Sequence, residues 1–249
     1  MYTCAECGEK YDTRQGLQCH SRSHIHDHII LTYTQRQIIL GSLLGDMSIR
    51  VGNGQSNPRI SAVQSTNQSD YLLWKYSALK NLTSSEPYID STVDNFGRIS
   101  GKDGFGELKR HYSLRFQTMS IPCLLPIYKM VRGDGNKYVS KPWLNEIVDP
   151  IGLAVWYMDD GCLTNKYAAR FALGSMSQEE QFAIQDWMLN RWDIDSTIFK
   201  QPNPVSSKWS YNIYSNLSIS SRKSNLHKFK ELVEPYIIPS MRYKIDAIG

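Results

Sequence analysis

Two apolar segments that both end in an aspartate constrain this chain more than any other feature. The first is IILGSLLGD over residues 38–46, and the second is IGLAVWYMDDG over residues 151–161. Asp149, followed by a proline, precedes the second segment as a helix start. Aligning the segments on their terminal carboxylates places Asp160 on Asp46. The sequence therefore predicts two equivalent helices with a carboxylate at the C-terminal end of each.

The stretches that follow these two segments also repeat. Apolar and polar periodicity predicts strands near 47–51, 59–66, 97–101, 110–118, 162–166, 168–176, 196–200 and 209–220, and helices near 70–83, 121–132, 178–192 and 224–237. A capping box is expected at the start of the first helix, from Thr34 to Gln37. We therefore predict an α+β fold of two αββαββα domains, over residues 33–133 and 144–249, packed as an internal pseudo-dimer.

Glycines in the first segment bear on how the two helices pack. Gly41 and Gly45 lie one helical turn apart and leave a strip where another backbone can approach closely. Helices packed in this way bring Asp46 and Asp160 together, and a divalent cation relieves their repulsion. Hard oxygen ligands suit Mg²⁺ (or Mn²⁺), which stabilises the attacking and leaving oxygens in phosphodiester hydrolysis. The helix dipole disfavours aspartate at a helix C-terminus, and metal binding explains its presence at both ends.

A separate pattern of cysteine and histidine occupies the first thirty residues. The spacing is Cys-x2-Cys-x12-His-x3-His, at Cys4, Cys7, His20 and His24. Tyr11 and Leu17 fall where so small a unit needs core side chains. Two thiolates and two imidazoles suit tetrahedral Zn²⁺, and without it this unit has too little core to fold. The pattern resembles a C2H2 zinc finger, and residues 1–28 are expected to form the finger and its linker. His26 is the alternative to His24 as the fourth ligand.

Zinc fingers of this type place a helix in the DNA major groove. The helix positions that would meet bases hold Thr13, Gln15, Gly16 and Cys19. Because Gly16 has no side chain to read a base, we expect the finger to add affinity and register more than sequence discrimination. Phosphate contacts are expected from Lys10, Arg14 and Arg22. The alternative role for this unit is docking to another protein.

The apolar segments also resemble a known pair of motifs. Residues 40–46 and 153–161 resemble the two LAGLIDADG motifs of homing endonucleases, and PYIIPSMRYK at 235–244 resembles the C-terminal signature of the single-chain, mitochondrial-intron type. The resemblance covers residues 34–249. It implies a saddle of two antiparallel sheets along double-stranded DNA, with the motif helices at the domain interface. It also implies a staggered double-strand cut across the minor groove at a long, nearly asymmetric site.

Roles for individual residues follow from the resemblance. Asp46 and Asp160 would be the metal ligands, and Lys244 would be the basic residue that positions water in the second half. Lys137 is our choice for the corresponding residue in the first half. Lys141 is the alternative, because the local spacing differs from the family pattern.

The two motifs are unequal in their surroundings. Asp159 stands where the first motif has Gly45. It would be a third carboxylate at the metal site or a structural residue, and we prefer the second interpretation. Gln64, on a predicted strand, would lie near the water network, and Met176 stands at the comparable place in the second half. The active site is therefore expected to be asymmetric.

Long polar side chains alternate with apolar ones along the predicted strands. The candidates for DNA contact are Arg50, Asn53, Gln55, Arg59, Lys102 and Arg115 in the first half, and Lys166, Arg170, Lys200, Lys208 and Asn212 in the second. Arginine and lysine suit guanine edges, asparagine and glutamine suit adenine, and all can contact phosphate. The alternative is the solvated face of two sheets, but the same enrichment in both halves favours groove contact.

Composition permits a nucleic-acid partner, because the 249 residues carry a net charge of +4. The chain has no signal peptide and no apolar run near the ~20 residues that span a bilayer, so we expect an intracellular protein. The interpretation we favour is a monomeric, site-specific double-strand DNA endonuclease that uses Mg²⁺ or Mn²⁺, with a Zn²⁺ finger that extends its DNA contact. The alternatives are a non-cleaving DNA- or RNA-binding regulator, an intron maturase on the same fold, and an adaptor that binds protein through the finger.

Overall fold

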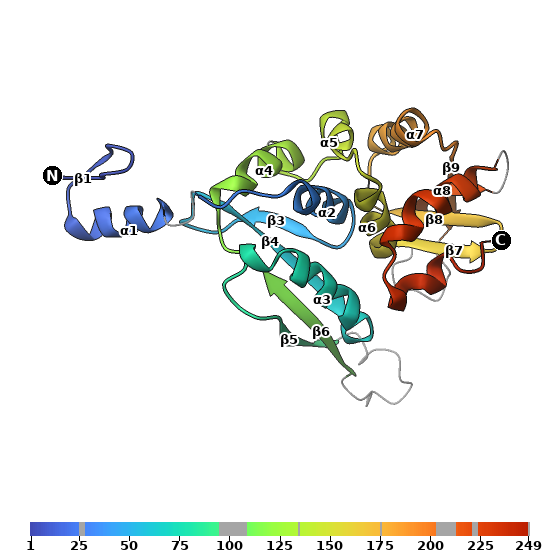
Figure 1. Ribbon diagram of the computed structural model, residues 1–249, viewed down its shortest axis with the longest axis horizontal. Coiled ribbons are helices and arrows are strands. Elements are labelled where there is room, and N and C mark those ends of the chain that lie inside the picture. Colours follow the sequence, from blue (N-terminus) through green and yellow to red (C-terminus); the bar gives the residue numbers. More distant parts are fainter. Residues whose placement is uncertain are drawn as a thin grey trace.

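The protein has a mixed α/β fold, with two four-stranded antiparallel sheets flanked by helices (Figure 1). The computed structural model describes residues 1–24, 28–94, 109–133, 135–174, 176–202, 213–220 and 224–248. At the N-terminus, β1 (Tyr2–Thr3) and β2 (Lys10–Tyr11) pair ahead of α1 (Arg14–His24). This ββα unit, drawn in blue in Figure 1, lies apart from the two sheets. The predicted fold class is confirmed.

The first half of the molecule carries one of the large sheets. Its elements are α2 (Tyr33–Leu44), β3 (Ser48–Val51), β4 (Pro58–Ser65), α3 (Ser69–Ala78), β5 (Tyr88–Asp94), β6 (Lys109–Gln117) and α4 (Leu125–Arg132), with short 3-10 turns at Thr66–Gln68, Lys80–Leu82 and Pro122–Leu124. The strand order is β3-β4-β6-β5. The sequence did not predict β5, and the strand expected near 97–101 lies outside the described residues.

The second half repeats this order of elements. It consists of α6 (Pro150–Asp160), β7 (Gly161–Asn165), β8 (Ala168–Gly174), α7 (Gln178–Trp192), β9 (Thr197–Pro202), β10 (Ile213–Ser220) and α8 (Asn225–Val233), followed by 3-10 turns at Glu234–Tyr236 and Pro239–Lys244. The strand order β7-β8-β10-β9 matches that of the first sheet. Between the halves, α5 (Lys141–Glu146) crosses the expected domain start at residue 144, and the domain limits stay a prediction.

Helices α2 and α6 pack against each other along most of their length. A side-chain carbon built on Gly41 would lie only 2.1 Å from the carbonyl oxygen of Gly152, so the two backbones touch at this point. Farther along, a carbon built on Gly45 would lie 2.4 Å from Cβ of Asp159. The contacts advance together along both chains, so the helices run in the same direction and end side by side.

The two helix starts differ in how well they were predicted. Asp149 caps α6 as expected, since its Oδ1 accepts a hydrogen bond from the Ile151 amide at 3.0 Å. The predicted capping box at Thr34 is wrong, because the box of α2 consists of Thr32 and Gln35. The side-chain nitrogen Nε2 of Gln35 also donates to the Ala78 carbonyl at 2.9 Å. This contact ties the start of α2 to the end of α3, which local sequence does not reveal.

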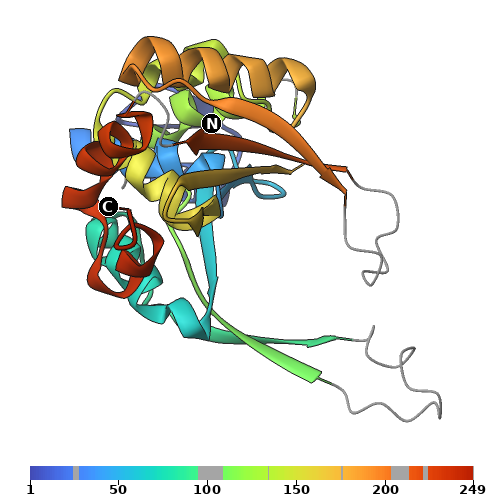
Figure 2. The ribbon, with the colours of Figure 1, turned by 90° about the vertical axis from the view of Figure 1, so that its right-hand side faces the viewer.

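Each large sheet buries one face beneath helices and leaves the other face open. In β4, Ile60 and Ala62 are buried on one face, whereas Arg59 on the opposite face is half-buried. In β8, Phe171 is buried and Arg170 is half-buried. Figure 2 shows the sheets extending as two arms from the paired helices, with α7 on the outer side of the second sheet. Among the described residues, no helix combines the length and apolar composition needed to cross a membrane.

Candidate active site

Two carboxylates from different halves lie at the same end of the paired helices. Asp160 is the last residue of α6, and Asp46 follows the end of α2. Burial, and then the charges of Asp46 and Asp159, raise the pKa of Asp160 from 3.8 to about 7. Within the described part of the chain, neither Asp46 nor Asp160 forms an ion pair. Two acidic side chains that repel each other and form no direct ion pair within the described residues fit a divalent-cation site.

Asp46 is held from both sides by polar groups. The Gln64 side chain, which the sequence analysis expected near the water network, donates to Oδ2 of Asp46 at 2.6 Å. The Asp46 amide donates to Oδ2 of Asp159 at 3.3 Å. The position equivalent to Gln64 in the second half is not Met176. Strand register places Leu173 there, because Ser61 pairs with Ser48 as Arg170 pairs with Cys162. The shorter β7–β8 turn causes the difference, and the polar contact exists on one side only.

Two lysines occupy equivalent places at the ends of the helices. Lys244 donates to the carbonyl of Met158 at 2.6 Å, two residues before Asp160. Lys137 donates to the carbonyl of Leu44 at 3.4 Å, two residues before Asp46. Loss of water lowers the pKa of both lysines, and nearby carboxylates oppose this shift. Each ammonium therefore satisfies a helix-end carbonyl and faces the carboxylate centre.

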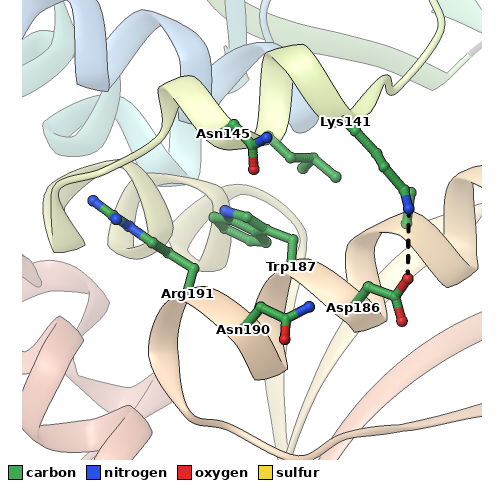
Figure 3. Close-up of a pocket in the computed structure, with 8 residues that line it drawn as sticks. Lys141, Asn145, Asp186, Trp187, Asn190 and Arg191 are labelled. Carbon is green, nitrogen blue, oxygen red and sulfur yellow. Dashed lines mark ion pairs between the residues drawn. The ribbon is translucent and has the colours of Figure 1, made fainter.

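Lys141, the alternative to Lys137, lies elsewhere. It belongs to a hollow of about 280 Å³ between α5 and α7, where its ammonium is 3.9 Å from Asp186 (Figure 3). Trp187 and Arg191 line the same hollow. This hollow shares no lining residue with the cavity beside Asp160. The geometry therefore supports Lys137 as the lysine of the first-half site.

A cavity of about 290 Å³ opens beside Asp160. Its lining includes Lys137, Leu173, Met176 and Glu180. Glu180 is buried, and its carboxylate accepts hydrogen bonds at 2.7 Å from the amides of Val139 and Ser177. It thus joins the start of α7 to the segment that carries Lys137. The cavity provides space beside a metal-ligand candidate and a lysine.

The predicted DNA-contact residues are spread over the open faces and turns of the sheets. Arg50 and Arg59 are neighbours across β3 and β4. Arg115, on β6, forms an ion pair with Asp90 at 3.0 Å. Arg170 lies over the ring of Phe199 on β9, 4.6 Å from its centre. Asn53 and Lys166 are exposed in the β3–β4 and β7–β8 turns, and Gln55 accepts a hydrogen bond from Ser120 at 2.7 Å.

Other predicted DNA contacts are not brought to the open faces. Lys200 pairs with Ser215, on the side of the sheet that carries Leu217, and it lines a hollow against α7. The structure thus places Lys200 on the helical side of the second sheet. Lys102, Lys208 and Asn212 lie outside the described residues, as does His26. The Arg22 side chain is likewise not described.

The ββα unit brings together the four predicted zinc ligands. One ligand atom each from Cys4, Cys7, His20 and His24 lies within 4.8 Å of the others. Glu9 lies 3.6 Å from Nδ1 of His20, and Glu6 lies 3.7 Å from Nδ1 of His24. These contacts turn the Nε2 atoms toward the cluster, as carboxylates beside zinc-bound histidines do. Backbone hydrogen bonds lower the pKa of Cys4 to about 7, which favours the thiolate that binds zinc. The cluster fits a tetrahedral metal ion.

Comparison with known families gives a clear assignment. Residues 36–228 match the LAGLIDADG DNA endonuclease family. The chain belongs to this family. The matched range includes both Asp46 and Asp160, most of α2 and all of α6.

Individual relatives extend this result. The chain is 30% identical over 216 residues to the cytochrome b mRNA maturase bI2 of Saccharomyces cerevisiae, covering 84% of this chain and 46% of the yeast protein. It is 27% identical over 227 residues to the DNA endonuclease I-ChuI of Chlamydomonas applanata, covering 87% of this chain and 96% of that protein. The chain thus spans about half the length of the yeast maturase and nearly all of I-ChuI.

A solved structure shows the same fold over almost the whole chain. The homing endonuclease I-WcaI, bound to its DNA recognition sequence, superposes with a TM-score of 0.72 at 17% identity. The superposition covers 96% of this chain and 95% of I-WcaI. At this identity the likeness establishes the LAGLIDADG fold and leaves the roles of side chains to the site itself.

Sequence reasoning missed two polar residues of this LAGLIDADG site. Glu180 had a visible signal, because Ser177-x-x-Glu180 is a capping-box pattern. Lys75 had none, since it lies in an apolar helix and meets Asp159 only in the folded protein. Its side chain is 1% exposed, and Asp159 is fully covered.

Proposed function

We propose that this protein is a divalent-metal-dependent, site-specific endonuclease that cuts both strands of DNA, in the manner of a homing endonuclease. The observation that carries the proposal is the pair Asp46 and Asp160, one from each half, at the touching ends of α2 and α6. A centre on the boundary between two similar halves can serve both strands of a duplex. Assignment to the LAGLIDADG DNA endonuclease family supports this reaction.

Each residue of the centre has a proposed task. A divalent cation, when bound, would stabilise the charge that develops on the phosphodiester oxygens. Asp46 and Asp160 would hold Mg²⁺ or Mn²⁺ through their carboxylate oxygens. Lys137 and Lys244, each fixed by a helix-end carbonyl, would orient water and attract the scissile phosphate. Gln64 would keep Asp46 oriented through its 2.6 Å contact.

The partner we propose is double-stranded DNA. A single copy of this chain would bind it along the open faces of both sheets. Arg50, Arg59 and Arg170 supply positive charge on these faces. I-WcaI, which shares the fold, is described as bound to its DNA recognition sequence. The ββα unit would hold Zn²⁺ and add DNA contacts of its own.

A cleavage assay with two conservative variants tests the proposal. The protein is incubated with a randomised duplex library and Mg²⁺, and the cut ends are sequenced to find its target. Asp46→Asn and Asp160→Asn keep the side-chain volumes and remove one anionic ligand each. We expect each variant to bind the target but to lose double-strand cleavage. Full cleavage by either variant would show that the paired aspartates are not the catalytic centre.

A second candidate function is RNA binding as an intron maturase, and the 30% identity to the yeast maturase favours it. This function needs no metal-dependent cleavage. Splicing of an intron RNA that the Asp46→Asn variant still supports, without DNA cleavage by the parent protein, would select it over the endonuclease.

A further inference from the structure

A buried ion pair joins the two halves directly behind the carboxylate centre. Nζ of Lys75, on α3, lies 2.5 Å from Oδ1 of Asp159, on α6. Both side chains are removed from water, with exposures of 1% and 0%. Charges buried this deeply cost free energy unless they are paired, so the two residues form one neutral unit. The ammonium also lies 4.3 Å from the centre of the Tyr71 ring.

The second oxygen of Asp159 reaches across to the first motif. Oδ2 accepts the hydrogen bond of the Asp46 amide at 3.3 Å. This amide has left the helix ladder, because the Ser42 carbonyl accepts instead from Gly45 at 3.1 Å and from Met47 at 2.9 Å. Without Asp159, the backbone of a proposed metal ligand would have no protein partner at this donor. Both oxygens of Asp159 are thus engaged by protein donors.

Gly45 makes this contact possible. A Cβ atom built on residue 45 would lie 2.4 Å from Cβ of Asp159 and 2.9 Å from its Oδ2. Any side chain there would push the carboxylate away from the Asp46 amide. The two unequal positions, Gly45 and Asp159, are therefore complementary. The Asp159 side chain occupies the space that a side chain at residue 45 would need.

Within the described residues, no equivalent ion pair stabilises the other motif. The position of Asp159 corresponds to Gly45, which has no carboxylate to offer. The buried residues of α7, the counterpart of α3, are Glu180, Gln181, Ile184, Trp187 and Met188. None of these is a cation that could match Lys75. The hydrogen bond from Asp159 thus reaches the Asp46 backbone and has no such counterpart at Asp160 among the described residues.

We propose that Asp159, held and neutralised by Lys75, is a positioning residue that fixes the Asp46 backbone and so orients the first-half metal ligand. It acts from the opposite half, through the Asp46 amide, and its carboxylate does not bind the metal. This inference rests on the proposed function only for the role of Asp46. The contact between Asp159 and the Asp46 amide stands independently of it.

Two double variants isolate the contact. Lys75→Met/Asp159→Asn keeps an oxygen that can accept from the Asp46 amide, whereas Lys75→Met/Asp159→Leu removes it. Both variants lose the same two charges, and replacing a buried ion pair by uncharged groups of similar volume is commonly tolerated. Any difference between them therefore reports the acceptor rather than the charge or the loss of the pair.

The first measurement is hydrogen exchange of the Asp46 amide, followed by NMR in protein labelled with ¹⁵N-aspartate. The expected result is exchange at least about tenfold faster in the leucine variant than in the asparagine variant, as loss of a hydrogen bond allows. Equal exchange in the two variants would overturn the proposal. This readout needs neither metal nor DNA.

The second measurement is a titration with Mn²⁺, in which electron paramagnetic resonance detects the free ion. We expect the leucine variant to bind Mn²⁺ at least about tenfold more weakly than the asparagine variant. Equal affinities would overturn the positioning role. If both were also far weaker than the parent protein, the carboxylate itself would be a third ligand. A change in exchange without Mn²⁺ binding to the parent would keep the contact and reject the proposed metal centre.

Discussion

At the residue level, the carboxyl group of Asp160 destabilises the metal-free folded protein when it ionises. Burial, and then the charges of Asp46 and Asp159, raise its pKa from 3.8 to about 7. The unfolded chain releases this proton near pH 4, and the folded chain releases it near pH 7. Between these values the folded state binds more protons, so its stability falls as the pH rises and stays low above pH 7.

Asp160→Asn should therefore stabilise the metal-free protein at high pH. The amide has the shape of the carboxyl group and cannot ionise. In buffer with a chelator, we expect the thermal midpoint of the variant to exceed that of the parent at pH 8 and to equal it near pH 4. Mn²⁺ should reduce the difference in thermal midpoint at pH 8, because only the parent offers both carboxylate ligands and is stabilised by the bound ion. A gap of the same size at both pH values would contradict the assigned pKa.

Lys137 and Lys141 give a matched comparison of the two lysine assignments. Lys137 contacts a helix-end carbonyl and faces Asp160, whereas Lys141 forms an exposed ion pair with Asp186 at 3.9 Å. We expect Lys137→Met to lower the single-turnover cleavage rate by about 100-fold or more, within the usual range for a group that assists proton transfer. Lys141→Met should leave the rate nearly unchanged. Reversed effects would transfer the role to Lys141.

At the scale of elements, Gly41 governs the contact between α2 and α6. A Cβ atom there would lie 2.1 Å from the Gly152 carbonyl oxygen, so the helices must separate to admit it. Gly41→Ala should lower the free energy of unfolding by about 2 kcal/mol or more, despite the better helix propensity of alanine. Urea unfolding measures this change. Thr34→Ala, at an exposed position of the same helix, is the control and should change stability little.

The same helices show what the sequence could predict. Apolar periodicity and the Asp149 cap located α2 and α6 well, and Gly41 and Gly45 predicted their close packing. Strand β5 was not predicted because apolar and polar residues alternate only weakly in YIDSTVD, which lies on the edge of its sheet. The pair of Lys75 and Asp159 escaped for a different reason. Its partners are 84 residues apart, and only the close packing of the two helices brings them together.

At the scale of the whole molecule, two similar halves surround a centre that is not symmetric. The lysines and aspartates follow the pseudo-two-fold relation, whereas Gln64 corresponds to Leu173 and Gly45 corresponds to Asp159. The additional contacts all converge on Asp46, while Asp160 borders an open cavity of about 290 Å³. Similar halves therefore supply the shared chemistry, and their differences distinguish the two strands that the centre would cut.

The ββα unit adds one more asymmetry, because it precedes the first half, and the described part of the second half has no counterpart to it. Deleting residues 1–28 should weaken binding to the target duplex and leave cleavage chemistry intact, since no residue of the carboxylate centre is lost. Each phosphate contact contributes about 0.9 to the slope of log affinity against log salt. The deletion removes the three predicted phosphate contacts, Lys10, Arg14 and Arg22, and should therefore reduce the slope by about 3. Cys4→Ser/Cys7→Ser keeps these charges but removes both cysteines of the proposed zinc site. If this variant binds as the deletion does, the finger must be folded to contact DNA. If the deletion itself binds with unchanged affinity and slope, the unit has another partner, and docking to a protein becomes its function.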